Sequence, residues 1–147
     1  MIRQNPACLI AADAAPGYGK AMRWMFVFAS LSGFIAIAIG AWTAHGADML
    51  LGPEKAGWVR TGVEYQATHS LALLAVGTMM SVRPGRFLGW SGTAFAIGIV
   101  LFSGGLYGLA LTDLTAFAYA TPLGGVALIT GWLLLAIYAL ALDRHAP

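Results

Sequence analysis

Charged residues are unevenly spread along the chain and leave four long stretches without any. These stretches cover residues 24–44, 65–82, 87–112 and 114–142. About 20 apolar residues in a helix span the ~30 Å hydrocarbon core of a bilayer, and only the second stretch needs Val63 and Glu64 at its edge to reach that length. The pattern therefore predicts four transmembrane helices, at residues 24–43, 63–82, 87–111 and 122–142.

Prolines and glycines mark where these helices are expected to begin and end. The sequence RPGR at residues 83–86 predicts a tight turn. Thr121 is a suitable N-cap and Pro122 a suitable first helical residue, so the fourth helix is expected to begin there. Pro53 opens the segment PEKAGWVRTG, which is mildly amphipathic and centred on Trp58. This segment is expected at the outer interface as a short helix, lying along the membrane or leading into the second long helix.

Composition agrees with a membrane protein. The chain is 59% hydrophobic and only 10% charged, whereas a soluble domain carries about 25% charged residues. The predicted fold class is an all-α integral membrane protein, a four-transmembrane-helix bundle with a short interfacial helix between helices one and two. Residues 1–20 are expected to form a flexible cytoplasmic tail, and residues 21–147 a single transmembrane domain.

Basic residues predict the orientation of the bundle. The segments that share one side with the two termini hold six of them, and the opposite side holds Lys55 and Arg60. Short loops rich in Lys and Arg stay in the cytoplasm, so both termini are expected there, in a multi-pass protein of a bacterial inner membrane. The six residues are Arg3, Lys20, Arg23, Arg83, Arg86 and Arg144.

Small residues at helical spacing predict close helix packing. Residues four apart lie on one face, and small side chains there let two backbones approach. We expect Leu in place of Gly104 or Gly108 to destabilise the bundle. The residues expected at helix contacts are Gly33, Gly40, Ser103, Gly104, Gly108, Gly125 and Gly131.

Polar side chains gather near the predicted outer side. Tyr65 and Gln66 precede His69 by four and three residues, so the three share a helix face. The first predicted helix ends close to His45, and Asp113 follows the third. Glu64 lies at the edge of the second helix, where it can stay ionised beside Arg60. The predicted polar cluster is His45, Glu64, Tyr65, Gln66, His69 and Asp113.

This cluster has a structural interpretation and a ligand-binding alternative. In the first, the side chains satisfy one another and the helix ends just below the outer interface, with Tyr65, Gln66 and His69 facing the end of the first helix near His45. In the alternative, they hold a quinone head group or a lipid, or the two histidines ligate haem. No metal-ligand spacing, nucleophile motif or phosphate-binding loop is present, so no metal site and no catalytic residue is predicted.

Five sequence blocks resemble a known family. GAWTAHGADML begins at Gly40, EYQATHSLALLAVG at Glu64, LFSGGLYGLALT at Leu101 and TPLGGVALITGW at Thr121, with a tryptophan at Trp58. In this order they resemble the domain-of-unknown-function 423 family of small inner-membrane proteins, related to transmembrane protein 256. The resemblance implies a four-helix membrane protein of no established activity, with signature positions at His45, Gly46, Tyr65, Gln66, His69, Ser103, Gly104, Tyr107, Thr121, Pro122, Gly124, Gly125 and Trp132.

Together these features predict a non-enzymatic membrane protein. We expect a structural, accessory or assembly subunit of a larger inner-membrane complex, such as a respiratory one, with no cofactor. Its expected partners are membrane lipids and other integral membrane subunits or a second copy of itself, and not nucleic acid. The alternative function is a small-molecule site for quinone, lipid or haem at the outer polar cluster around His45 and His69.

Overall fold

A computed structural model of the chain describes residues 18–142 and is helical over nearly all of that range. Predictions for residues 1–17 and 143–147, including most of the flexible tail, lie outside the described residues. The elements are α2 (Tyr18–His45), α3 (Ala47–Leu51), α4 (Pro53–Val82), α5 (Arg86–Gly98), the π-helix η1 (Ile99–Ser103), α6 (Gly104–Thr112) and α7 (Thr115–Leu142).

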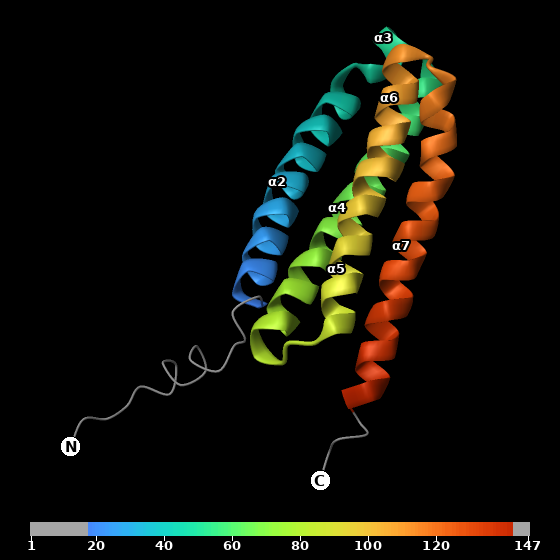
Figure 1. The fold of residues 1–147 in the computed structure, drawn as a ribbon. Coiled ribbons are helices and arrows are strands. Elements are labelled where there is room, and N and C mark those ends of the chain that lie inside the picture. The colour runs from blue at the N-terminus through green and yellow to red at the C-terminus, as the bar shows by residue number, and fades with distance from the viewer. Residues whose placement is uncertain (1–17, 143–147) are drawn as a thin grey trace, which may run out of the picture.

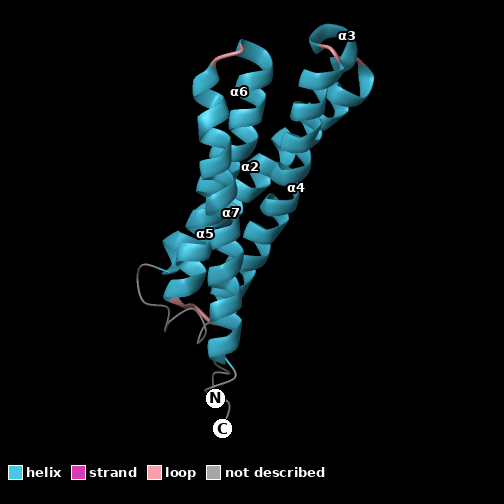
Figure 2. Cartoon of the chain, turned by 90° about the vertical axis from the view of Figure 1, so that its right-hand side faces the viewer, coloured by secondary structure: helices cyan, strands magenta, loops and turns pink. Residues whose placement is uncertain are grey.

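The long helices run side by side as four rods (Figure 1), because α5, η1 and α6 follow one another without a break. The start of α2, the α4–α5 link and the end of α7 lie at one end of the molecule. The short helix α3 and the α6–α7 turn lie at the other end, as Figure 2 also shows. This arrangement puts the two ends of the described chain on the same side.

Three of the rods are long and apolar enough to cross a membrane. They are Gly19–His45, Arg86–Thr112 and Thr115–Ala141, each 27 residues long. The third predicted helix is therefore correct to within one residue at each end. The rod α4 has 30 residues and ends at the predicted Val82, but its first half carries several charged side chains, which lower its hydropathy.

The segment after Pro53 is not a separate interfacial helix. Pro53 lies at the start of α4, and the helix continues from there through Gly62 to Val82. Glycine weakens a helix by only about 1 kcal/mol, so Gly62 does not end it. Of the two placements expected for this segment, the structure has the one that leads into the second long helix. The five-residue helix α3 lies between α2 and α4.

The predicted start of the fourth helix is wrong. Helix α7 begins at Thr115, and Pro122 lies inside it. Proline within a helix removes one backbone hydrogen bond. The turns before Pro122 are held by α6 instead: the Phe117 ring covers Gly108, and the Thr121 hydroxyl lies over Gly105. This tertiary packing outweighs the local signal for a helix start.

The hydrophobic core lies between two helix pairs. Helix α2 packs along α4, the α5–η1–α6 rod packs along α7, and α4 joins the two pairs. At the end where α2 begins and α7 ends, the Tyr138 hydroxyl donates a 2.6 Å hydrogen bond to the Arg83 carbonyl. The buried apolar core comprises Met25, Ala29, Ala72, Leu73, Val76, Met80, Leu88, Phe95, Ile99, Leu128 and Tyr138.

Glycines allow side chains of neighbouring helices to approach the backbone. A Cβ added to Gly62 would lie 2.6 Å from the Tyr107 ring, and one at Gly131 would lie 2.6 Å from the Phe95 ring. The same holds for Gly108 and Phe117, at 2.6 Å. The contacts at Gly108 and Gly131 agree with the predicted packing positions, whereas Gly62 gave no sequence signal of packing.

The other predicted packing positions differ among themselves. A Cβ at Gly40 would lie 3.3 Å from Val63, and one at Gly125 would make an ordinary contact with Phe102 at 3.7 Å. At Gly33 and Gly104 no neighbouring atom of the described chain lies within 4 Å of such a Cβ. These two glycines do not mark close helix contacts, so we no longer expect a leucine at Gly104 to disturb the packing.

Candidate functional site

Four buried or half-buried polar side chains bond to one another between α2, α4 and α6. We call Ser32, Gln66, Ser70 and Tyr107 the amide network, because the Gln66 side-chain amide joins the helices. Its Nε2 donates to the Ser32 carbonyl at 3.0 Å and lies 3.2 Å from the Ser32 hydroxyl. Its Oε1 accepts a 2.7 Å hydrogen bond from the Tyr107 hydroxyl.

The partners fix the orientation of the Gln66 amide. A backbone carbonyl can only accept, so the nitrogen of the amide must face Ser32 and the oxygen must face Tyr107. Ser70 completes the amide network: its Oγ lies 2.8 Å from the Ser32 Oγ and 2.7 Å from the Gln66 carbonyl. Three helices are thus held together by hydrogen bonds where water is scarce, and an unpaired polar group there is costly.

His69 uses both of its ring nitrogens within the chain. Nδ1 lies 2.7 Å from the Tyr65 carbonyl, and Nε2 lies 3.2 Å from the indole nitrogen of Trp132. An indole N–H only donates, so Nε2 is the acceptor and Nδ1 carries the proton. The ring therefore joins α4 to α7, with both nitrogens hydrogen-bonded within the chain.

Aromatic rings surround this histidine. The centroid of its ring lies 5.8 Å from that of Tyr65 and 5.7 Å from that of Phe95. The Trp132 ring lies edge-on at 6.2 Å from His69 and 5.2 Å from Phe95. The Tyr65 ring is stacked on His69, and the other pairs are tilted or edge-on. Such aromatic pairs stabilise by about 0.5–1.5 kcal/mol beyond area burial. His69 is only 7% exposed, so it forms part of the packed interior.

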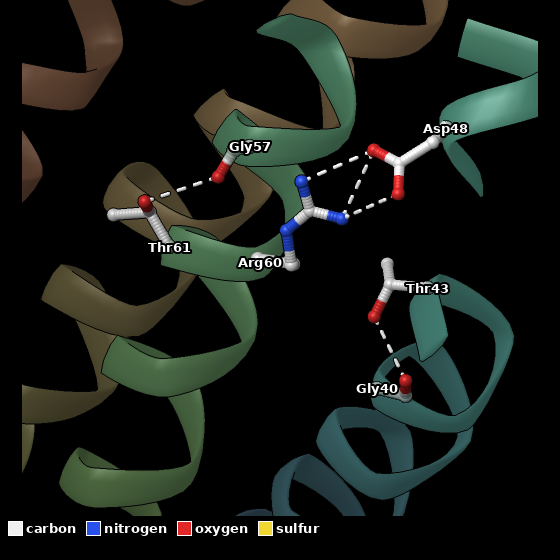
Figure 3. Close-up of polar contacts among 6 residues, drawn as sticks. All are labelled: Gly40, Thr43, Asp48, Gly57, Arg60 and Thr61. Carbon is white, nitrogen blue, oxygen red and sulfur yellow. Dashed lines mark hydrogen bonds and ion pairs between the residues drawn. The ribbon is translucent and has the colours of Figure 1, made fainter. Parts of the chain in front are cut away.

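The charged side chains near the α3 end of the molecule form ion pairs. Arg60 contacts both carboxylate oxygens of Asp48, each at 3.1 Å, and so ties α4 to α3 (Figure 3). Lys55 pairs with Asp113 at 2.6 Å and ties α4 to the α6–α7 turn. The expected pairing of Arg60 with Glu64 is therefore wrong, because the bidentate Asp48 carboxylate takes up the guanidinium.

The predicted polar cluster does not form as one site. Gln66 and His69 belong to two separate sets of contacts, and Tyr65 stacks on the His69 ring. Glu64 and His45 are exposed, and Asp113 is held by Lys55. Gln66 faces Ser32, which lies 13 residues before His45, or about 20 Å along α2 at 1.5 Å per residue. The expectation that this turn of α4 faces the end of α2 is wrong.

Several of the interacting residues were not predicted from the sequence pattern. Ser32 and Ser70 are serines in apolar stretches, where a hydroxyl most often bonds to its own helix backbone, so they gave no signal. Tyr107 and Trp132 were marked only by the family resemblance. Within residues 18–142 no group of three or more His, Cys, Asp or Glu side chains could hold a metal ion.

Comparison with known proteins gives consistent matches. Residues 39–125 match the family model described as protein of unknown function (DUF423). The chain is 45% identical over 122 residues to the UPF0382 inner membrane protein YgdD of Escherichia coli K12, covering 83% of this chain and 93% of that protein. It is 41% identical over 107 residues to a UPF0382 membrane protein of Haemophilus influenzae, covering 73% and 86%.

A third relative has a lower identity. A UPF0382 membrane protein of Staphylococcus saprophyticus is 37% identical over 116 residues, covering 79% of this chain and 96% of that protein. No solved structure matches the fold. The matches cover between 86% and 96% of these relatives, so the likeness extends over most of the chain and not over one motif.

Proposed function

The chain belongs to the DUF423 family of integral membrane proteins, and we propose that it acts there as a structural or assembly subunit of a larger inner-membrane complex. One observation carries this proposal. Among the described residues, every buried side-chain nitrogen or oxygen except the Ser103 hydroxyl has a hydrogen-bond partner within the chain. The interior polar groups thus serve to hold the helices together, which suits a rigid module.

The outer surface supports the same proposal. Large apolar side chains are exposed on every rod, among them Phe34 at 71%, Leu71 at 68% and Ile129 at 70%. In a membrane, such surfaces face lipid or the helices of another subunit. A small rigid bundle can therefore contribute helix faces to a complex.

Native electrophoresis of membranes tests this role. In gently solubilised membranes, the chain is expected in a band far larger than its 15.4 kDa plus detergent, together with other integral membrane proteins. Deleting the gene should lower the amount of that same complex, and re-expression should restore it. If the chain migrates alone or only with copies of itself, and no other complex changes on deletion, the proposal is wrong.

We further propose that α4 is the fourth membrane span and that both termini are cytoplasmic. Residues 63–82 of α4 hold no Lys or Arg, and 20 residues are enough to cross a bilayer. Arg83 and Arg86 lie at the same end of the bundle as Lys20 and Arg23, as the positive-inside rule requires.

Reporter fusions measure this orientation. A fusion after Pro147 or within the 83–86 turn should report the cytoplasm, and one beside Pro53 should report the outer side. A reporter that is active only outside the cytoplasm and one that is active only inside it serve as mutual controls at each position. Cytoplasmic signals at both Pro53 and Pro147 would mean that α4 does not cross the membrane.

A further inference from the structure

A groove open to lipid runs between α2 and the η1–α6 part of the third rod. Its first hollow, of about 420 Å³, is lined by Ser32, Gln66 and Tyr107 among apolar side chains. A second hollow of about 410 Å³ is purely apolar in its lining residues and shares Phe28 and Val100 with the first. The two form one groove with a polar end and an apolar end.

The groove exists because α2 packs on α4 and scarcely contacts the third rod. Gly104 leaves further room, since a Cβ there would meet no neighbouring atom of the described chain within 4 Å. Ile99 and Val100 of the π-helix form part of the wall. π-Helical turns inside long helices occur frequently at functional sites, so the π-helix in this wall supports a role of the groove in ligand binding.

The polar end of the groove presents acceptors. Both N–H groups of Gln66 face Ser32, and the single hydroxyl proton of Tyr107 goes to Gln66 Oε1. The Ser70 proton goes to the Gln66 carbonyl at 2.7 Å, because a carbonyl only accepts, and the Ser32 proton then goes to Ser70 Oγ at 2.8 Å. What remains are lone pairs on the Tyr107 oxygen and on Gln66 Oε1. A partner for this end must therefore donate a hydrogen bond.

The position of the polar end further limits which ligands can bind there. Ser32 is the fifteenth of the 28 residues of α2, so the polar end lies near the middle of the helix. A charged or zwitterionic head group would have to leave the membrane surface to reach it, which is costly. An uncharged ring with hydroxyl donors and an apolar tail meets both conditions.

We propose that this groove binds the hydroquinone ring of a quinol, with the ring hydroxyls at Tyr107 and Gln66 and the tail along Phe28 and Val100. This inference is independent of the assembly role. It also predicts that the groove prefers the reduced form of the ligand, because the oxidised quinone has only acceptor oxygens and cannot donate a hydrogen bond. The chain is expected to bind the reduced form more tightly and to transfer no electrons itself.

Titration of the purified full-length chain in nanodiscs tests the proposal. The probes are decylubiquinol, kept reduced under argon, decylubiquinone, and 1-decanol as a hydroxyl on the same tail. We expect decylubiquinol to bind at least about fivefold more tightly than decylubiquinone, the effect of about one hydrogen bond, and 1-decanol to bind more weakly than either. Equal binding of the reduced and oxidised forms, or equal binding of 1-decanol, would overturn the proposal.

Two variants locate the site. Gly104→Leu fills the groove and should weaken quinol binding at least about tenfold, whereas Gly33→Leu, at another open glycine, should leave binding unchanged. Val100→Trp fills the groove from a side chain that is 56% exposed and gives a second, independent test of the same site. Quinol affinity that survives in a folded groove-filling variant would place the ligand elsewhere and refute the inference.

Discussion

Gly124→Ala is expected to destabilise the fold by at least about 2 kcal/mol, the cost of forcing an extra group into a closely packed interface. A Cβ at Gly124 would overlap the backbone of Leu101 and Phe102, with the Phe102 nitrogen as its nearest atom. Backbone cannot swing aside as the end of a flexible side chain can. The two helices would have to separate, at the point where η1 meets α7.

The neighbouring glycine supplies the matched control. A Cβ at Gly125 would make an ordinary contact with the Phe102 ring at 3.7 Å, and alanine favours a helix over glycine by about 1 kcal/mol. Gly125→Ala should therefore be neutral or stabilising. Thermal unfolding in detergent, followed by circular dichroism, measures both variants. Similar unfolding temperatures for the two would contradict the close approach of α7 to η1.

Gln66→Leu should cost about 2–3 kcal/mol of stability. The change keeps the size of the side chain but leaves the Tyr107 hydroxyl without its acceptor and removes the bond from the Gln66 amide to the Ser32 carbonyl, which keeps only its bond within α2. Hydrogen bonds between membrane helices contribute about 0.6 kcal/mol on average and up to about 1.7, and a buried group left unpaired costs about 1–3 kcal/mol. Because Gln66 holds α4 to both α2 and α6, the losses at its two ends add.

Thr68→Leu is the control, since Thr68 lies on the same turn of α4 but is exposed. It should change stability little. Unfolding by increasing mole fractions of a denaturing detergent gives the free energies, and Tyr107→Phe in both backgrounds shows whether the Tyr107 bond depends on Gln66. If Gln66→Leu is as stable as Thr68→Leu, the amide network does not hold the helices together.

The helices could be read largely from the sequence because their signals are local. The 83–86 turn has a proline, a glycine and two arginines, and the helices on both sides of it end close to where they were predicted. The start of α7 was missed because Thr121 and Pro122 carry a strong local signal for a helix start. What keeps the helix intact through them is the contact with α6, which a local pattern cannot contain.

The candidate site depended on information that is not local. The face shared by Tyr65, Gln66 and His69 followed from helical spacing, but the residue opposite Gln66 depends on how far α2 and α4 slide past each other. The hydropathy boundaries suggested that His45 lies opposite this face. Helix α4 instead begins at Pro53, and Gln66 lies opposite Ser32. When two apolar helices shift past each other by a few turns, their contact stays equally apolar. The residue of α2 that bonds to Gln66 could therefore not be chosen from the sequence.

The pairing of glycines with aromatic rings has a consequence for how this family can vary. The ring of Tyr107 occupies the space that a side chain at Gly62 would need, and the Phe95 ring does the same at Gly131. Neither partner can enlarge alone. In homologues, a bulkier residue at a glycine position should therefore appear together with a smaller one at its ring position, so that these distant positions evolve as linked pairs.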